Sequence, residues 1–151
     1  MIDRPSRNTM AENLRHYVSG RITNDDLADS NIRFEDRGVK AVYDMAWQLY
    51  DDLYQHKATG RHRIEGELRD YVARWVCFLH TDLEYQWPKY NFIQIKNLPL
   101  NILTLGWWEK RKQKKWDEFE THGDFKYWPF ISHQDYQSAL ENPKLLSKES
   151  D

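Results

Sequence analysis

Two stretches of the chain carry apolar residues at the three-four spacing of an amphipathic helix. In the first, the apolar and aromatic positions recur from Val39 to Tyr54, and in the second they gather on one face from Leu68 to Leu79. A polar loop over residues 57–63 separates them. Two helices joined by a short loop pack as an antiparallel pair. We therefore predict a mainly α domain built on helices over 38–56 and 65–83.

Shorter elements are expected around this pair, each from a local capping signal. Thr9 and Glu12 fit a capping box, and Thr23 or Asn24 can cap a second helix. Ser132 precedes an acidic residue at the right spacing to open the last helix. The sequence predicts helices at residues 9–18, 107–121 and 132–141, and a short helix that starts at residue 23 or 24. Residues 125–131, which are rich in aromatic side chains, are expected to be extended.

The boundaries of the domain follow from the same pattern. Residues 9–143 are expected to form a single domain. Residues 1–8 carry no periodic signal and are expected to form a disordered extension, and residues 144–151 are expected to form a frayed tail. Residues 90–105 fit either a helix or a small β-hairpin, so an α+β fold is the alternative.

Composition limits the class of protein. Aromatic residues make up 15% of the 151 residues and charged residues 30%, and the mean hydropathy is −0.92. This excludes a membrane-spanning, collagen-like or low-complexity chain. The net charge of −2 argues against a dedicated nucleic-acid coat or a polybasic membrane binder. The single cysteine, Cys77, and the lack of an apolar run at the N-terminus predict a cytoplasmic protein.

Four stretches together point to a known kind of protein: residues 20–25, 47–53, 82–88, and 123–125 leading to 128–130. In order and spacing they resemble a family of small, uncharacterised bacterial proteins, over about residues 14–140. The resemblance implies a bacterial, cytoplasmic origin. It implies no activity, cofactor or functional residue.

A basic segment flanked by tryptophans is the most conspicuous local feature. Five basic residues and one acidic residue lie between positions 107 and 115. The cations could contact the phosphates of a nucleic acid and the tryptophans its bases, or the segment could lie on an anionic membrane surface. A solvated helix that docks through Trp108, Trp116 and Phe119 is the plainer interpretation. The candidate binding residues are Trp107, Lys110, Arg111, Lys112, Lys114 and Lys115.

Catalytic and metal-binding signals are sparse. Asp82 and Glu84 could form an acidic cluster with His80, which would suit a small enzyme. No two histidines have the spacing of a helical zinc pair, and no phosphate-binding loop is present, so we expect no metal and no cofactor. The best overall prediction is a non-enzymatic binding or protein-interaction module. The last aromatic run contains Tyr127, Trp128 and Phe130. These side chains could form a binding surface, but we predict that they belong to the core.

Overall fold

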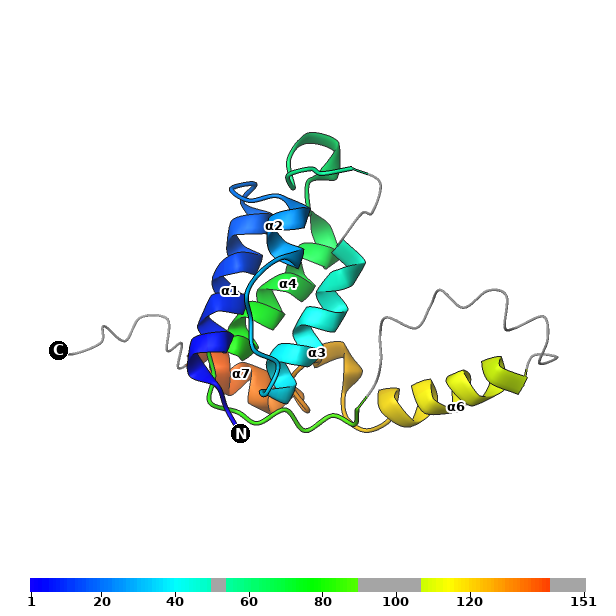
Figure 1. Cartoon of the computed structure of the whole chain (residues 1–151). Coiled ribbons are helices and arrows are strands. Elements are labelled where there is room, and N and C mark those ends of the chain that lie inside the picture. The colour runs from blue at the N-terminus through cyan, green and yellow to red at the C-terminus, as the bar shows by residue number, and fades with distance from the viewer. Residues whose placement is uncertain (50–53, 90–106, 142–151) are drawn as a thin grey trace.

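The computed structural model describes residues 1–49, 54–89 and 107–141 (Figure 1). This part of the chain is mainly helical and contains no strand, which confirms the predicted class. The alternatives for 90–105 and the tail from 144 lie outside the described residues. The helices are α1 (Arg4–Val18), α2 (Asn24–Ala28), α3 (Arg37–Ala46), α4 (Gly66–Leu79), α6 (Trp107–Glu120) and α7 (His133–Glu141), with 3₁₀ turns η1 (Trp47–Leu49), η2 (Gly60–His62) and η4 (Phe125–Tyr127).

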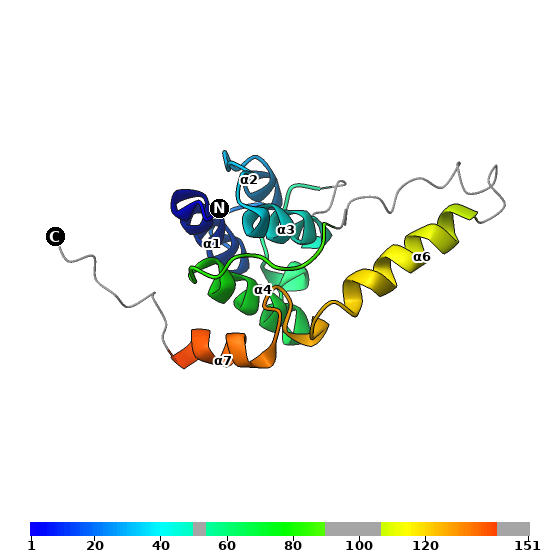
Figure 2. The same cartoon turned by 90° about the horizontal axis from the view of Figure 1, so that it is seen from below.

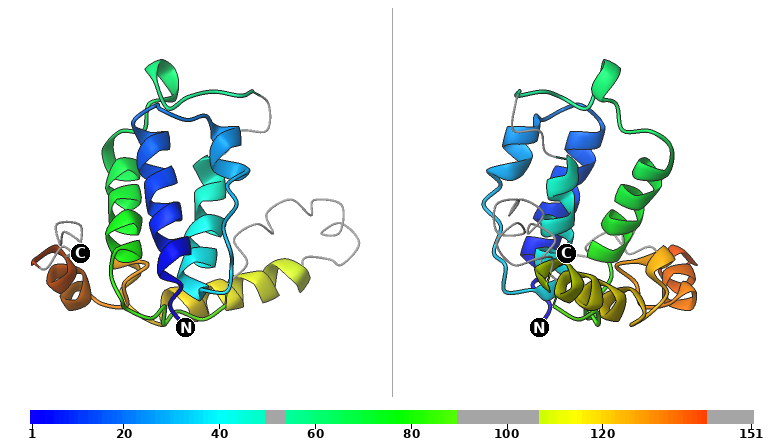
Figure 3. Two further views of the ribbon diagram at one scale, coloured as in Figure 1. Left: turned by 60° about the vertical axis from the view of Figure 1, so that its left-hand side comes forward. Right: turned by 90° about the vertical axis from the view of Figure 1, so that its right-hand side faces the viewer.

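Helices α1, α3 and α4 stand side by side as a bundle, and α2 lies at its upper end (Figures 1 and 3). Helix α4 runs antiparallel to the other two, as expected for a helix that follows α3 through a loop (Figure 3). Its most extensive packing is against α1, and its packing against α3 is smaller. The predicted pair is therefore part of a three-helix bundle, in which α1 supplies most of the cover for α4.

The first helix of the predicted pair ends earlier than its periodicity suggests. Helix α3 stops at Ala46 and one 3₁₀ turn follows. Farther on, the Asn24 side chain donates to the Tyr54 carbonyl at 3.1 Å and accepts from the His56 amide at 2.7 Å. The Tyr54 carbonyl and the His56 amide thus bond to a side chain at the start of α2 and not to partners within a helix. The prediction of a helix through residue 56 is therefore wrong. Helix α4 likewise ends at Leu79 rather than at residue 83.

The N-terminal residues are part of the fold, so the predicted disordered extension over 1–8 is wrong. Asp3 caps α1 by accepting a hydrogen bond from the Ser6 amide at 3.2 Å, and Pro5 stands in the first turn, where its missing N–H is no loss. Thr9 is inside the helix and not its cap. Arg7 is fully buried, which ties this segment into the bundle.

The aromatic segment after α6 closes the lower end of the bundle. Trp87 is fully buried, and its indole N–H donates to the carbonyls of Pro129 and Phe130 at 3.1 and 3.2 Å. The Trp128 indole donates to the Tyr85 hydroxyl at 3.1 Å. Trp128 and Phe130 thus belong to the core and Tyr127 packs partly buried against it, as the core interpretation predicted. The segment opens with the 3₁₀ turn η4, so it is not extended throughout.

Candidate nucleic-acid interface

Helix α6 projects from the bundle, with its C-terminal end toward the body and its N-terminal end away from it (Figures 1 and 2). The anchor is at the C-terminal end. Phe119 is fully buried, and its ring centroid lies 5.1 Å from that of Trp87. Trp116 is half-buried, stacked on Phe119 and edge-on to Phe125 at 5.4 Å. The predicted helix is confirmed, and Trp116 and Phe119 do share its docking face.

The charges of α6 are ordered along its axis. The five basic residues lie in the distal part, between 110 and 115, and the last turns carry Asp117, Glu118 and Glu120. The N-terminal end of a helix carries a partial positive charge and the C-terminal end a partial negative charge. Asp117, Glu118 and Glu120 therefore stand where the dipole disfavours them, as does Lys110 in the first turn, while the other four basic residues lie beyond the first turn. This order gives the protruding end a concentrated positive potential.

The stretch of α6 between the tryptophans at 107–108 and Trp116 is polar around its whole circumference. Residues 109–115 contain no apolar side chain over almost two helical turns. Successive residues of a helix are about 100° apart, so the basic positions cover more than half of the circumference. A helix that lies in a membrane surface needs a continuous apolar stripe. This stretch has none, whereas phosphates can be contacted from any side.

The structure places the predicted binding residues on this one element. Trp107, Lys110, Arg111 and Lys112 occupy the distal turns of α6. Lys114 and Lys115 are exposed to solvent. The Lys114 ammonium lies 3.9 Å from the Glu118 carboxylate, and both side chains are largely exposed. Such a surface pair contributes little to stability and leaves the cation available to a ligand.

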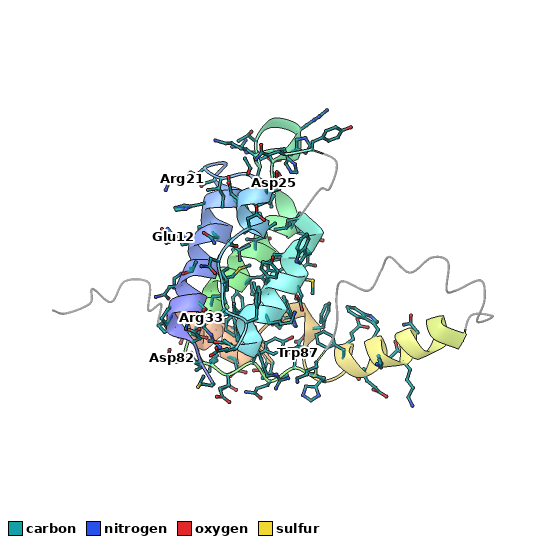
Figure 4. All side chains as sticks on the ribbon, in the orientation of Figure 1. Glu12, Arg21, Asp25, Arg33, Asp82 and Trp87 are labelled. Carbon is teal, nitrogen blue, oxygen red and sulfur yellow. The ribbon has the colours of Figure 1, made fainter. Side chains whose placement is uncertain are left out.

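The three residues proposed for an enzyme lie near the N-terminal end of α1, where each has its own surroundings. Asp82 pairs with Arg4 near the start of α1, and Glu84 lies 3.4 Å from the N-terminal amino group (Figure 4). His80 caps the end of α4 and its Nε2 is buried without a hydrogen-bond partner among the described residues. No contact in the described part of the chain joins the three side chains into one site.

Burial also sets the protonation of two groups on α4. Burial, followed by the positive charges of Arg15 and Arg4, lowers the pKa of His80. Burial raises the pKa of the Cys77 thiol. A neutral imidazole and a protonated thiol are the forms expected at neutral pH, and neither is an activated nucleophile.

The structure brings together two histidines that sequence spacing does not reveal. The ring of His56 stacks on that of His62 at 4.3 Å between centroids, and His56 Nε2 lies 3.1 Å from the Tyr17 hydroxyl. Arg61 Nε donates to His62 Nε2 at 2.9 Å. Within residues 1–49, 54–89 and 107–141, no three His, Cys, Asp or Glu side chains gather as metal ligands. The two histidines lie in a loop, where no regular spacing could reveal them.

Comparison of the chain with protein-family models, with curated proteins and with solved structures found no match in any of the three. Within the described residues, no helix combines the length and the apolar content that a bilayer crossing requires.

Proposed function

We propose that this protein is a non-enzymatic binding module whose helix α6 contacts a nucleic acid. The observation that carries the proposal is the geometry of α6: an anchored C-terminal end and a protruding end with five basic residues. A projecting helix of this charge can reach phosphates that a flat surface would not. The rest of the molecule is slightly acidic, so the contact is local and of limited size.

The polar circumference of residues 109–115 favours a nucleic acid over a membrane surface. Binding to lipid would depend on burying apolar side chains below the headgroups. Binding to phosphates depends on cations alone and is strongest where they are concentrated. The experiment below must therefore distinguish binding to a nucleic acid from binding to an anionic membrane.

The setting that we propose is the bacterial cytoplasm, where nucleic acid is accessible. The sequence resembles small bacterial proteins in four stretches, and its one cysteine, Cys77, is half-buried with a raised pKa, as suits a structural thiol in a reducing compartment.

The proposal is tested by fluorescence anisotropy with a short labelled DNA duplex and the matching single strand at low salt. The triple variant Lys110→Gln, Lys112→Gln, Lys115→Gln removes three cations from α6. Its affinity is expected to fall by about tenfold or more, because each phosphate contact contributes to binding through counterion release.

The control removes three exposed cations from the loop at the other end of the bundle: Lys57→Gln, Arg61→Gln, Arg63→Gln. This variant has the same net charge as the first and is expected to bind like the wild type. Equal losses in both variants would mean that net charge, not α6, governs binding. Cosedimentation with phosphatidylserine vesicles but no binding to either DNA would replace the proposal with the membrane alternative.

A further inference from the structure

A second candidate site lies on the outer face of α3, away from α6. Lys40, Tyr43, Asp44 and Trp47 follow one another at helical spacing and so share one face. Phe34, from the loop before α3, packs on Tyr43 with 4.7 Å between ring centroids, and Tyr43 is edge-on to Trp47 at 5.9 Å. Phe34 is 42% exposed and Trp47 36% exposed, which is uncommon for large rings in contact with each other.

A small apolar pocket opens beside these rings. Tyr43 and Trp47 form one side of it, and the other lining residues come mainly from α2 and the adjoining turns: Asn24, Leu27, Ala28, Ala46 and Leu49. The Tyr43 hydroxyl donates to the Ala28 carbonyl at 2.9 Å, which fixes this ring at the edge of the pocket. The pocket has an accessible volume of only about 10 Å³, room for about one water, so it offers an aliphatic chain an apolar rim to pack on and not a cavity to fill.

Negative charge lies next to the rings. Asp44 is only 7% exposed at its side chain. Burial, and then the charges of Asp29 and Asp44, raise the pKa of the Tyr43 phenol, so both carboxylates act on the same ring. Aromatic faces and a buried carboxylate together are the chemistry that binds an organic ammonium group.

The chain itself already places an ammonium here. Lys40 Nζ lies 2.8 Å from each oxygen of Asp44 and 5.7 Å from the Phe34 ring centroid. The Lys40 side chain is about half-exposed, so it covers the site from the solvent side and can leave it by rotating. Asp44, in contrast, is held in place by the helix and its burial.

We propose that this face, defined by Phe34, Lys40, Tyr43, Asp44 and Trp47, is a binding site for a lysine side chain of a partner protein. The incoming ammonium replaces Lys40 between Asp44 and Phe34, and a neighbouring aliphatic group packs on the exposed rings of Phe34 and Trp47. Charge complementarity supports this partner, because the carboxylates of Asp29 and Asp44 both act on the Tyr43 ring of this face. The site is independent of α6 and of the nucleic-acid proposal.

The test uses two peptides that differ in one charge, acetyl-Leu-Lys-Leu-amide and the same peptide with norleucine in place of lysine. Binding is followed by NMR through the indole N–H resonance of Trp47, assigned from its loss in Trp47→Phe. The lysine peptide is expected to shift this resonance and to bind about fivefold more tightly than the norleucine peptide.

Variants separate the site from a general apolar contact. Lys40→Gln removes the internal competitor, so the affinity for the lysine peptide is expected to rise by about fivefold, while the matched control Lys57→Gln leaves it unchanged. Phe34→Leu and Asp44→Asn are expected to abolish the preference for lysine over norleucine. Because Phe34 is an exposed loop residue, Phe34→Leu keeps the test valid if Asp44→Asn is unstable. Equal binding of the two peptides, or no Trp47 shift even in Lys40→Gln, would overturn the proposal.

Discussion

Arg7 and Asp36 form a buried ion pair where the lower ends of α1, α3 and α4 meet. Arg7 Nε donates to Asp36 Oδ2 at 2.6 Å, Nη2 donates to Oδ1 at 3.2 Å, and both side chains are at most 2% exposed. Asp36 also caps α3 by accepting from the Gly38 amide, and Arg7 Nη1 donates to the Thr81 carbonyl at 2.9 Å. This one pair therefore connects three helices.

Replacing Arg7 by methionine should destabilise the fold by about 3–5 kcal/mol. The substitution keeps an apolar stem but leaves the Asp36 carboxylate buried without its counter-ion. The free energy of unfolding, measured by urea denaturation with circular dichroism, gives the size of the loss. Arg63→Met is the matched control, since Arg63 pairs with Glu65 at 3.6 Å on the surface, and it should have little effect. Equal stability of the two variants would contradict a structural role of the buried pair.

The same carboxyl predicts how stability depends on pH. Burial opposes ionisation of Asp36, but hydrogen bonds from Arg7 and from the amides of Asp3 and Gly38 outweigh it and hold its pKa below the usual value. The folded state then binds the proton less readily than the unfolded state. The contribution of ionised Asp36 to the free energy of unfolding is complete above about pH 4, the pKa of an unfolded aspartate, and is lost as the pH falls further.

Urea denaturation at a series of pH values from neutral to acid checks this prediction. The Asp36→Asn variant should be less stable at neutral pH and should lose less stability on acidification than the wild type. Some acid sensitivity will remain, because hydrogen bonds also lower the pKa of Asp3 and Asp26. Parallel pH profiles of the two proteins would show that Asp36 does not contribute.

Truncation of Trp128 tests the place of the C-terminal aromatic segment in the core. Its ring is edge-on to Trp75 at 6.0 Å and 3% exposed. Trp128→Ala should cost about 3–5 kcal/mol and lower the melting temperature by several degrees at least, because it opens a cavity and removes the partner of Tyr85. Leu140→Ala, at a position that is 51% exposed, is the control. A melting curve of Trp128→Ala that matches the control would place the segment outside the core.

Much of the fold could be predicted because its signals are local. Thr23 caps α2 as expected, and the Ser132 hydroxyl accepts from the Asp135 amide at 3.2 Å, as the sequence around it indicated. The start of α6 and the apolar face of α4 from Val72 to Leu79 could likewise be found from spacing, although Leu68 and Tyr71, predicted on the same face, are 39% and 43% exposed. Each of these features depends on residues within a few positions of one another.

The errors arose where a residue depends on a distant partner. Arg7 looks like a surface residue in sequence, because its burial is compensated by Asp36, which is 29 positions away. Residues 54 and 56 were predicted in a helix, but their backbone groups bond to the side chain of Asn24, which is 30 or more positions away. The candidate residues Asp82 and Glu84 are close in sequence, yet their ion-pair partners, Arg4 and the N-terminal amino group, could not be found from sequence. The aromatic face of α3 has no local signal, because Phe34 joins it from a loop.

The central claim, that α6 contacts a nucleic acid through its basic residues, is tested most directly by the salt dependence of DNA affinity. A plot of log affinity against log salt concentration has a slope of about −0.9 for each phosphate neutralised on a duplex. The triple variant Lys110→Gln, Lys112→Gln, Lys115→Gln should make this slope shallower by about 2–3, since up to three phosphate contacts are lost. The loop variant Lys57→Gln, Arg61→Gln, Arg63→Gln should keep the wild-type slope. The same slope in all three proteins, or no binding of the wild type at low salt, would contradict the claim.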